Sequence, residues 1–351
     1  MSPEHDLPNG AEQRQRVTSR DVAAAAGVHQ STVSRVLNGD QRISNNTRKR
    51  VEATAEQLGY VPSKRAQNLR TRRSGVVGVM VHDIDNAFYL SLLSDMHREL
   101  SAVGYSIVLI VDPLHRRSDI SRMRHLFDDS LDGMLITTAM IDSEIPPALR
   151  ARGMPLVLAV RSMPDLDVDT VESDNVAAGR EAARHLVALG HTDIAVAMGP
   201  KETSTTRDRL RGVLDVIQTE LPPDRVMHGP YRHETGYAMC RRLMMGERPP
   251  TAIIAGNDVM AIGVLDSAWR TGLSTPEDVS VLGFDDIPMA AWQAINLTTV
   301  RQDSKAIAEQ AARRLVDRID QPDSPPHHDI FPVSLTVRAT TGPPRAKHPR
   351  N

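Results

Sequence analysis

Charged and polar side chains stand at the ends of several short apolar runs, where they could bind a hydroxylated or charged small molecule. Asp83, Arg161, Asn257 and Asp285 each occupy such a position. An arginine donates paired hydrogen bonds to a carboxylate or hydroxyl, and an aspartate accepts from neighbouring hydroxyls. Any one of these residues could instead be a helix cap or a loop ion pair. Their recurrence at run ends favours a ligand site.

Catalytic chemistry has no comparable signature. The sequence contains no Gly-x-Ser-x-Gly, phosphate loop or cluster of metal-ligand residues, and the segment 75–78 lacks the dinucleotide fingerprint. Cys240 is the only cysteine, so no intrachain disulfide can form and no second thiol can share a zinc ion. We therefore expect no catalytic residue, no metal site and no cofactor.

Basic side chains are concentrated near the start of the chain. Residues 11–75 hold 13 Lys and Arg against five Asp and Glu, a net charge of +8, which leaves −10 on the remainder because the whole chain carries −2. A basic head on an acidic body is typical of a module that binds a polyanion. A merely solvated charged surface is the simpler explanation of the charge alone.

The helix signals beneath this charge favour DNA binding. Thr18 and Asp21 form a capping-box pattern before a short helix that Gly27 ends. A second helix is predicted over 29–38, and a third is capped by Ser44 and ended by Gly59. In the second helix, Val33, Val36 and Leu37 face inward, so Gln30, Ser31, Ser34 and Arg35 point outward. Two short helices joined by a glycine turn predict a helix-turn-helix. A small helical bundle without a DNA role is the alternative, which the charge disfavours.

The rest of the chain alternates apolar runs with amphipathic helical stretches. Buried strands are predicted at 76–81, 105–111, 133–137 and 156–160, with helices near 88–103, 118–130 and 144–152. A second series has strands at 194–198, 252–255 and 279–284, with helices near 175–189, 205–219, 233–245 and 258–271. This repetition predicts an α/β core of two doubly wound parallel-sheet lobes. Ligands of such sheets bind beyond the carboxyl ends of the strands, here in the cleft between the lobes.

Length and composition agree with several folding units. The 351 residues exceed the ~250–300 at which single cores stop growing. The first residues are polar, and no apolar run approaches the ~20 residues that span a bilayer. We expect a protein that is neither secreted nor embedded in a membrane, and a cytoplasmic, nucleoid-associated location.

The segment from Val17 to Gly39 resembles the opening of the lac/galactose repressor (LacI/GalR) family of bacterial transcription regulators. The likeness continues through residues 58–70 and through core motifs at 81–89, 171–175, 186–191, 209–212, 257–258, 283–286 and 297–300, so that it covers about 17–340. It implies an all-α helix-turn-helix head with a hinge helix and a periplasmic-binding-protein-like core. The boundaries expected are a disordered tail at 1–16, the head at 17–62, the hinge at 63–74, the core at 75–340 and a disordered tail at 341–351. Lobe 1 takes about 75–172 and 300–330, and lobe 2 about 173–299 and 331–340.

The resemblance also assigns roles to individual residues. The base-reading positions are Gln30, Ser31 and Arg35, and the minor-groove positions are Leu69, as an apolar wedge, and Ala66. Phosphate contacts are expected from Thr18, Thr32, Ser34, Asn38, Arg50, Lys64, Arg65 and Arg70. Effector contacts are expected from Asp83, Phe88, Tyr89, Arg161, Thr203, Thr205, Arg209, Tyr231, Asn257 and Asp285.

Together these features predict a repressor whose affinity for operator DNA is controlled by a small molecule in the cleft. Sugars or their derivatives are the expected class of effector, and nucleobases are the second candidate class. A homodimer is expected on double-stranded, pseudo-palindromic DNA, because one head reads too few bases for specific affinity, and a tetramer is the alternative. A solute-binding receptor and a cleft enzyme are the rival functions. The basic head argues against the first, and the missing catalytic motifs argue against the second.

Overall fold

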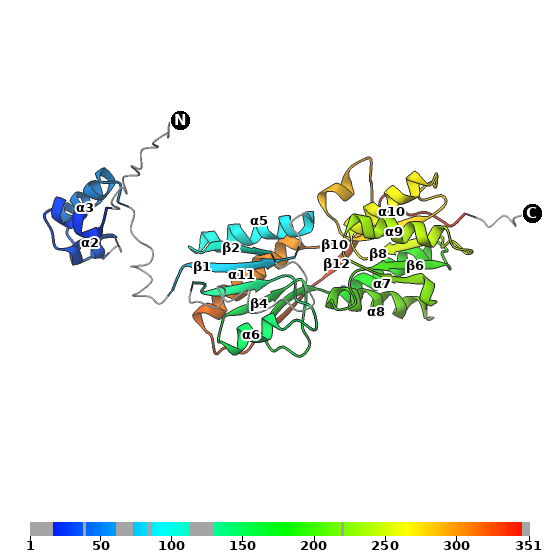
Figure 1. The fold of residues 1–351 in the computed structure, drawn as a ribbon, viewed down its shortest axis with the longest axis horizontal. Helices are drawn as coiled ribbons and strands as arrows, with labels where there is room; N and C mark the ends of the chain where they lie inside the picture. Colours follow the sequence, from blue (N-terminus) through cyan, green and yellow to red (C-terminus); the bar gives the residue numbers. More distant parts are fainter. Residues whose placement is uncertain are drawn as a thin grey trace, which may run out of the picture. The chain divides into compact units, whose positions relative to one another are not determined.

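The computed structural model describes residues 17–37, 40–60, 73–82, 86–111, 130–218 and 221–345. The chain divides after Ser74 into two compact units, a head and a core, each of which is described by itself (Figure 1). None of the helices described is long and apolar enough to cross a membrane.

The described residues of the head form three helices: α1 (Ser19–Ala25), α2 (Gln30–Leu37) and α3 (Asn45–Gln57). Thr18 caps α1 in the predicted capping box with Asp21, and Ser44 caps α3. Val22, Val33 and Val51 are fully buried at the centre, one from each helix. The predicted helix-turn-helix is therefore confirmed. Gly27, at φ +61°, makes the turn between α1 and α2, a conformation that favours glycine.

The first lobe of the core is built on a six-stranded parallel sheet with strand order β11-β5-β4-β3-β1-β2. Its strands are β1 (Val76–Val81), β2 (Ser106–Val111), β3 (Gly133–Ile136), β4 (Leu156–Ala159), β5 (Asp169–Ser173) and β11 (His328–Phe331). Helices α5 (Ala87–Ala102) and α11 (Ser304–Asp320) pack together on one face, and α6 (Ile145–Ala151) lies on the other (Figure 1).

The second lobe has a six-stranded sheet of order β12-β10-β9-β8-β6-β7, in which β12 alone is antiparallel. Its strands are β6 (Ile194–Met198), β7 (Val226–His228), β8 (Ala252–Ala255), β9 (Ser280–Asp285), β10 (Thr298–Gln302) and β12 (Val333–Thr336). Its helices are α7 (Asn175–Ala188), α8 (Ser204–Ile217), α9 (His233–Met244) and α10 (Asp258–Arg270), with 3₁₀ turns η2 (Pro223–Arg225) and η3 (Pro288–Ala291). Helices α7 and α8 cover one face, and α9 and α10 cover the other (Figure 1).

Glycines let the helices of each pair in the second lobe approach closely. A Cβ at Gly179 of α7 would overlap the backbone of Arg209, and one at Gly212 of α8 would overlap that of Val176. Gly236 and Gly263 play the same part between α9 and α10. The α7–α8 contact is relevant to function because it fixes the backbone from which Arg209 projects.

The chain crosses between the lobes three times, between β5 and α7, between β10 and α11, and between β11 and β12. Asp174 and Asp303 cap the helices that begin directly after the first two crossings. Three short connections therefore hold the lobes together, the arrangement from which a hinge between domains is built.

The approximate lobe boundary expected at 300 lies a few residues early, because β10 of lobe 2 pairs with β9 as far as Arg301 and ends at Gln302. The described part of the predicted disordered tail, 341–345, packs on lobe 2, where the Gly342 carbonyl accepts from His191 and Ser280 and Arg345 pairs with Asp278. The predicted tail at 1–16 and residues 63–72 of the predicted hinge at 63–74 lie outside the described residues.

Candidate functional site

A cavity lies between the two lobes of the core, at the carboxyl ends of their strands. The space left between its side chains is about 30 Å³, room for one or two water molecules. Its lining comes from the last residues of β9 and β10, from the segments that follow β1, β4, β7 and β8, and from the first two turns of α5 and α8. The lining residues are His82, Asn86, Phe88, Tyr89, Val160, Arg161, Thr205, Arg209, Tyr231, Arg232, Asn257, Asp285 and Gln302. This is where a doubly wound fold binds ligands.

Arg209 and Asp285 form the polar centre of the second-lobe wall. Arg209 is 3% exposed, and it donates to the Asn175 side chain over 2.9 Å and to the Gly256 carbonyl over 2.6 Å. Its other terminal nitrogen lies 3.5 Å from Asp285 Oδ1, which also accepts from the Gln302 amide over 2.6 Å. The guanidinium stacks on the Phe284 ring at 4.6 Å. The network holds a donor fork and an acceptor side by side, a pair suited to adjacent sugar hydroxyls.

Burial shifts the ionisation of the acids in this wall. It raises the pKa of Asp285 to about 6, against the opposing effects of Arg209 and Gln302. Burial also raises the pKa of Asp258 well above its ordinary value, and the nearby charge of Asp285 adds to the rise. Asp258 accepts from the Thr299 hydroxyl and the Ile287 N–H, so it supports the wall rather than facing the cavity. Of these two acids, Asp285 is therefore the one whose carboxylate can accept a hydrogen bond from a ligand in the cavity.

Tyr231 forms an aromatic platform at the same wall. Its hydroxyl is hydrogen-bonded to Thr206 over 2.7 Å and to Thr205 over 3.2 Å. The ring packs so closely on Gly199 that a Cβ at this glycine would overlap it. A face of this kind suits a sugar or base ring.

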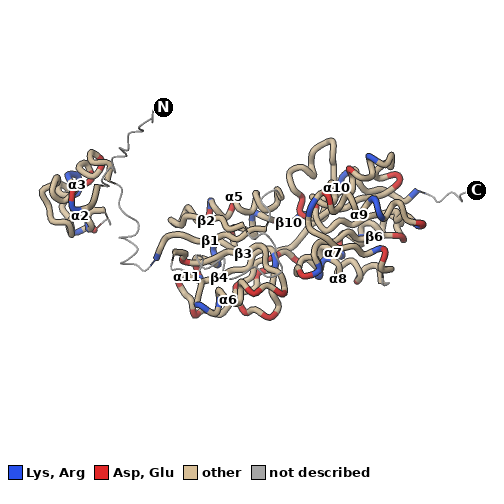
Figure 2. The backbone as a smooth tube through the Cα atoms, viewed as in Figure 1, with Lys and Arg blue, Asp and Glu red and all other residues tan. Residues whose placement is uncertain are grey.

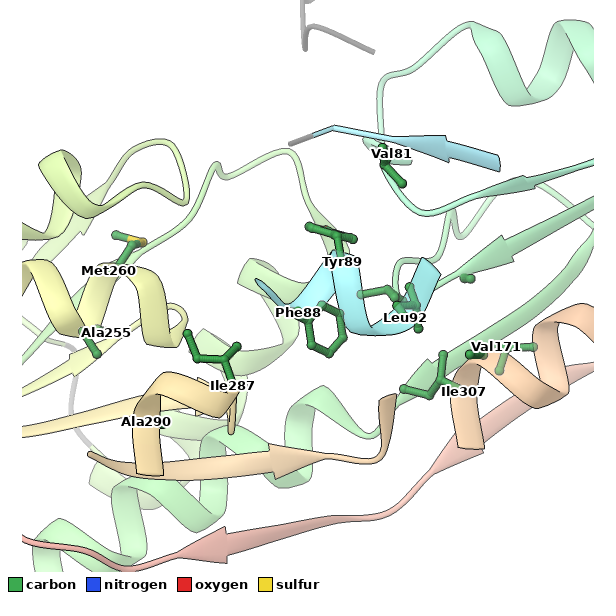
Figure 3. Packing of buried hydrophobic residues seen from close by; sticks show 14 of the residues in the cluster. Val81, Phe88, Tyr89, Leu92, Val171, Ala255, Met260, Ile287, Ala290 and Ile307 are labelled. Carbon is green, nitrogen blue, oxygen red and sulfur yellow. The ribbon is translucent and has the colours of Figure 1, made fainter. Parts of the chain in front are cut away.

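The first-lobe wall comes from the start of α5 and the end of β4. Asn86 caps α5 by accepting from Phe88 N, which places Phe88 and Tyr89 on the first turn of the helix (Figure 3). Phe88 belongs to a buried apolar cluster that includes Ile287 and Ala290 of the second lobe (Figure 3). Tyr89 accepts a hydrogen bond from Arg161 Nη2 over 3.3 Å.

Strained backbone is concentrated at this cavity. Val160 has φ +72° and Asp285 has φ +114°, and the next residue, Asp286, has φ +56°. A β-branched residue in the left-handed region is a conformational outlier. Such strain persists where the surrounding structure enforces it, and it clusters at ligand sites.

The structure brings together eight of the ten residues predicted to bind the effector. Phe88, Tyr89, Arg161, Thr205, Arg209, Tyr231, Asn257 and Asp285 line the cavity. Thr203 does not line it, because its hydroxyl donates to Pro200 O and caps α8 while the residue is fully buried. Asp83 lies outside the described residues. The prediction missed His82, Asn86, Val160, Arg232 and Gln302. The first four lie within two residues of a predicted position in the sequence, and that proximity was the only local signal for them. Gln302 ends a strand that was not predicted from the sequence.

The head presents the predicted DNA-facing side chains on α2 and α3. Gln30, Ser31, Ser34 and Arg35 are exposed on α2, and Arg50 is exposed on α3. Lys and Arg positions occur along both of these helices (Figure 2). Arg35 pairs with Asp40 over 3.0 Å. Thr18 is exposed at the α1 cap, and Thr32 is partly buried. Asn38, Lys64, Arg65, Ala66, Leu69 and Arg70 lie outside the described residues.

The start of α2 departs from a simple hydroxyl cap. The His29 ring accepts at Nδ1 from the Ser31 N–H over 3.3 Å and contacts the Ser31 hydroxyl at 2.9 Å. Gln30 donates to the Ser19 hydroxyl over 3.0 Å, which ties α2 to α1. The first turn of α2, which carries two of the predicted base-reading residues, is thereby held in place.

Metal chemistry has no support in the described part of the chain, where no group of three or more His, Cys, Asp or Glu is placed to hold an ion. A helix-turn-helix head together with a two-lobed core that has a polar cleft defines a DNA-binding regulator with a small-molecule site.

The comparisons with known proteins agree with this class. Residues 18–63 match the model of bacterial regulatory proteins of the lacI family, and residues 183–341 match that of the periplasmic binding protein-like domain. The HTH-type transcriptional regulator MalR of Streptomyces coelicolor is 33% identical over 92% of this chain and 95% of its own. CelR of Thermobifida fusca is 32% identical over 93% of this chain and 99% of its own.

Solved structures show the same likeness. The lac repressor dimer bound to operator and the anti-inducer ONPF has a TM-score of 0.82 at 27% identity, over 93% of this chain and 100% of that one. The CelR–cellobiose complex has a TM-score of 0.70 at 30% identity, with the same coverage. The chain belongs to the lacI family of bacterial regulatory proteins, a family of transcription regulators and not of enzymes. The predicted family and fold class are confirmed.

Proposed function

We propose that this protein is a homodimeric transcription repressor whose affinity for a pseudo-palindromic operator is controlled by a sugar or sugar derivative bound in the cleft of the core. One observation carries the proposal: a capped helix-turn-helix head is joined in the same chain to a cavity whose polar lining comes from both lobes. Because operator DNA is its partner, we place the protein with the chromosome in the cytoplasm.

The DNA side of the proposal rests on the head. Gln30, Ser31 and Arg35 would read base edges in the major groove, where glutamine suits adenine and arginine suits guanine. Arg50 would contact phosphate together with Thr18, Thr32 and Ser34. The minor-groove wedge at Leu69, with Ala66, and the phosphate contacts at Asn38, Lys64, Arg65 and Arg70 remain predictions from the sequence.

The effector side rests on the second-lobe wall. Arg209 would donate to one sugar hydroxyl and Asp285 would accept from its neighbour, with Tyr231 and Phe88 against the ring faces. A sugar is supported by two relatives of this fold, CelR in its complex with cellobiose and an Enterococcus faecium regulator with bound ribose. Since the described cavity is small, a ring would have to widen the cleft, and the three crossings would absorb that movement.

Dimerisation is supported by the surface of the first lobe. Leu90 on α5 and Val108, Leu109 and Val111 on β2 are between 41% and 51% exposed. β2 is an edge strand of this sheet and contacts α5, and exposed apolar side chains at a sheet edge are available to a second subunit. The lac repressor, whose fold this chain shares, is a dimer on its operator. A tetramer stays the alternative.

The control mechanism requires a different effector affinity in the two states of the dimer. Effector binding would change the angle between the lobes, and thereby the spacing of the two heads on DNA. A coupling of ~1–3 kcal/mol between the sites is typical of such systems. A ligand with equal affinity for both states would not change operator binding.

The test begins with a thermal-shift screen of sugars and sugar derivatives, followed by operator binding measured by fluorescence anisotropy with and without the hit. The operator is first selected from genomic fragments that the purified protein retains. We expect Asp285→Asn and Arg209→Ala to lose the response to the hit while ligand-free operator affinity stays within about twofold of the parent. Asp215→Asn is the matched control, because Asp215 is exposed and pairs only with Arg180 at the surface. An unchanged response in the Asp285 or Arg209 variants would remove this wall from the site, and a screen with no hit that alters operator binding would overturn the proposal.

A further inference from the structure

Arg161 is a buried cation in the first-lobe wall of the cleft. The residue is 2% exposed, and its two terminal nitrogens donate to Thr138 O and to the Tyr89 hydroxyl, both over 3.3 Å. Its Nε has no hydrogen-bond partner. The Tyr231 ring faces it at 5.9 Å, near the limit of a cation–π contact. These are few and weak interactions for a charge this deeply buried.

Arg209, across the cavity, provides the contrast. It is buried to the same degree, but it makes two shorter hydrogen bonds and an ion pair with Asp285. Asp285 is the one acid among the described lining residues, and Arg209 already neutralises it. Of these two buried arginines, Arg161 alone has no ion pair with any described residue, so its charge is not balanced by an acid in the part of the chain that the structure describes.

A buried cation with neutral partners alone is costly, because it has given up its hydration without a compensating charge. The guanidinium group matches the two oxygens of a carboxylate or phosphate in shape and in hydrogen bonding. Tyr89 adds a second donor. Its oxygen accepts from Arg161, so its O–H hydrogen is available to a ligand, and burial raises the pKa of Tyr89 and keeps that proton in place.

Backbone strain lies beside this feature. Val160 directly precedes Arg161 and holds φ +72° in the cavity wall, with its N–H bonded to Val171 O over 2.8 Å. Arg161 thus projects from an enforced turn rather than from a relaxed loop. Backbone strain of this kind is typical of ligand clamps.

We propose that the effector is an anionic sugar derivative, whose carboxylate or phosphate binds Arg161 and Tyr89 while its hydroxyls bind Arg209 and Asp285. This inference rests on the proposed function and narrows its ligand class. Sugar acids and sugar phosphates share the required oxyanion, and the experiment separates them. Residues 83–85, which include Asp83 and Asp85, lie outside the described residues.

The first experiment measures binding of matched ligands to the full-length protein by calorimetry. The panel holds glucose, galactose and ribose, each as the neutral sugar, the sugar acid and the terminal phosphate. For at least one of the three sugars, we expect the acid or the phosphate to bind at least 30-fold more tightly than the neutral sugar. Removing one partner of a buried ion pair typically lowers affinity by this factor or more. A preference for the acid or for the phosphate identifies the oxyanion.

Two outcomes would overturn the inference, and they bear differently on the proposed function. If a neutral sugar binds as well as its anionic counterparts and alters operator binding, the inference fails and the proposed function stands. If no member of the panel binds or alters operator binding, both fail.

The second experiment tests the residue. Arg161→Gln should lower the affinity for the anionic ligand by at least 30-fold and leave that for the neutral parent within about threefold, so the ratio of the two affinities collapses. Arg161→Lys keeps the charge without the planar fork and should restore part of the ratio. Arg180→Gln, at a half-exposed arginine paired with Asp215 away from the cavity lining, is the matched control and should change neither affinity. Thermal melting checks that each variant folds. If Arg161→Gln does not fold, the ratio of affinities is measured on Arg161→Lys instead. An unchanged ratio in a folded Arg161 variant would show that this cation does not bind the ligand's charge.

Discussion

Gly199→Ala should act through a single side chain, Tyr231, and its effect can be worked out from the structure. Gly199 follows the last residue of β6, and a Cβ there would overlap three atoms of the Tyr231 ring. The ring cannot stay in place, and if it moves, its hydroxyl loses hydrogen bonds of 2.7 Å to Thr206 and 3.2 Å to Thr205. The aromatic platform of the cleft would be displaced while the rest of the fold is retained.

The magnitude follows from these losses. Overpacking of a filled site costs ~1–3 kcal/mol, and each hydrogen bond contributes ~0.5–1.5 kcal/mol. We expect the free energy of unfolding of the core to fall by ~2–6 kcal/mol, the sum of these losses, measured by urea denaturation followed by circular dichroism. Effector affinity should fall at least tenfold. Gly246→Ala is the control, because its Cβ would meet Leu243 O at an ordinary 3.4 Å, and it should cost under ~0.5 kcal/mol.

A double-mutant cycle decides whether the ring is the cause. In a Tyr231→Ala background the aromatic ring is absent, so the new methyl group of Gly199→Ala no longer overlaps it. In that background Gly199→Ala should lower the free energy of unfolding by less than ~1 kcal/mol. Equal costs in both backgrounds would refute the reasoning, as would a Gly199→Ala protein that is as stable as the parent and binds effector normally.

Three further predictions concern the head, the hinge and the acid of the cleft. Arg35→Ala should cost ~1–3 kcal/mol at one base pair of each half-site, whereas Arg50→Ala should weaken binding to all sequences alike; equal losses for Arg35→Ala on operator and random DNA would make it a phosphate contact. Leu69→Ala should reduce operator bending, measured by fluorescence transfer, and leave non-specific binding nearly unchanged; undiminished bending would exclude the wedge. Because the pKa of Asp285 is about 6 when folded and near 3.9 when unfolded, the folded state binds its proton more tightly, and the unfolding free energy should fall by roughly 2 kcal/mol as pH rises from 4 to 6. That fall should be absent in Asp285→Asn and present in Asp215→Asn, and identical pH profiles for the parent and Asp285→Asn would contradict it.

The elements that the sequence predicted well are those with a strong local signal. Thr18, Gly27 and Ser44 mark helix ends through side-chain capping and backbone conformation, and the structure has those ends where they were expected. The central strands of both sheets are continuous apolar runs that two layers of helices bury, so local hydrophobicity was sufficient to find them.

The strands that the sequence did not reveal depend on partners far along the chain. In β5, Asp169 is buried because Arg318 pairs with it over 2.7 Å, and Glu172 is buried beside His328 at 2.8 Å. In β10, the buried Thr298 and Thr299 are bonded to Thr341 and Asp258. These strands carry polar groups inward, and no local pattern shows that another segment will satisfy those groups.

The same limit explains the errors at the site. The rule that ligands bind at strand ends placed Asn257 and Asp285 correctly at the cavity, whereas Gln302 was missed because β10 was missed. Thr203 was assigned by resemblance, but a hydroxyl at a helix start is a ready cap, and here it makes that local bond. A single sequence cannot distinguish a threonine that caps a helix from one that faces a ligand.

The cleft network is joined directly to the crossings between the lobes. Arg209 holds Asn175, the first residue of α7 after the β5 crossing, and Asp285 holds Gln302, whose neighbour Asp303 caps α11 after the β10 crossing. A ligand that hydrogen-bonds to Arg209 and Asp285 must compete with the Arg209–Asn175 and Gln302–Asp285 hydrogen bonds that fix these two connections. Since an effector shifts an equilibrium only by its differential contacts with the two states, bonds shared between the ligand site and the hinge are a physical route for that difference. Arg161 lies in the first lobe. A ligand that binds both Arg161 and Arg209 therefore contacts both walls of the cleft, and its affinity depends on the angle between the lobes.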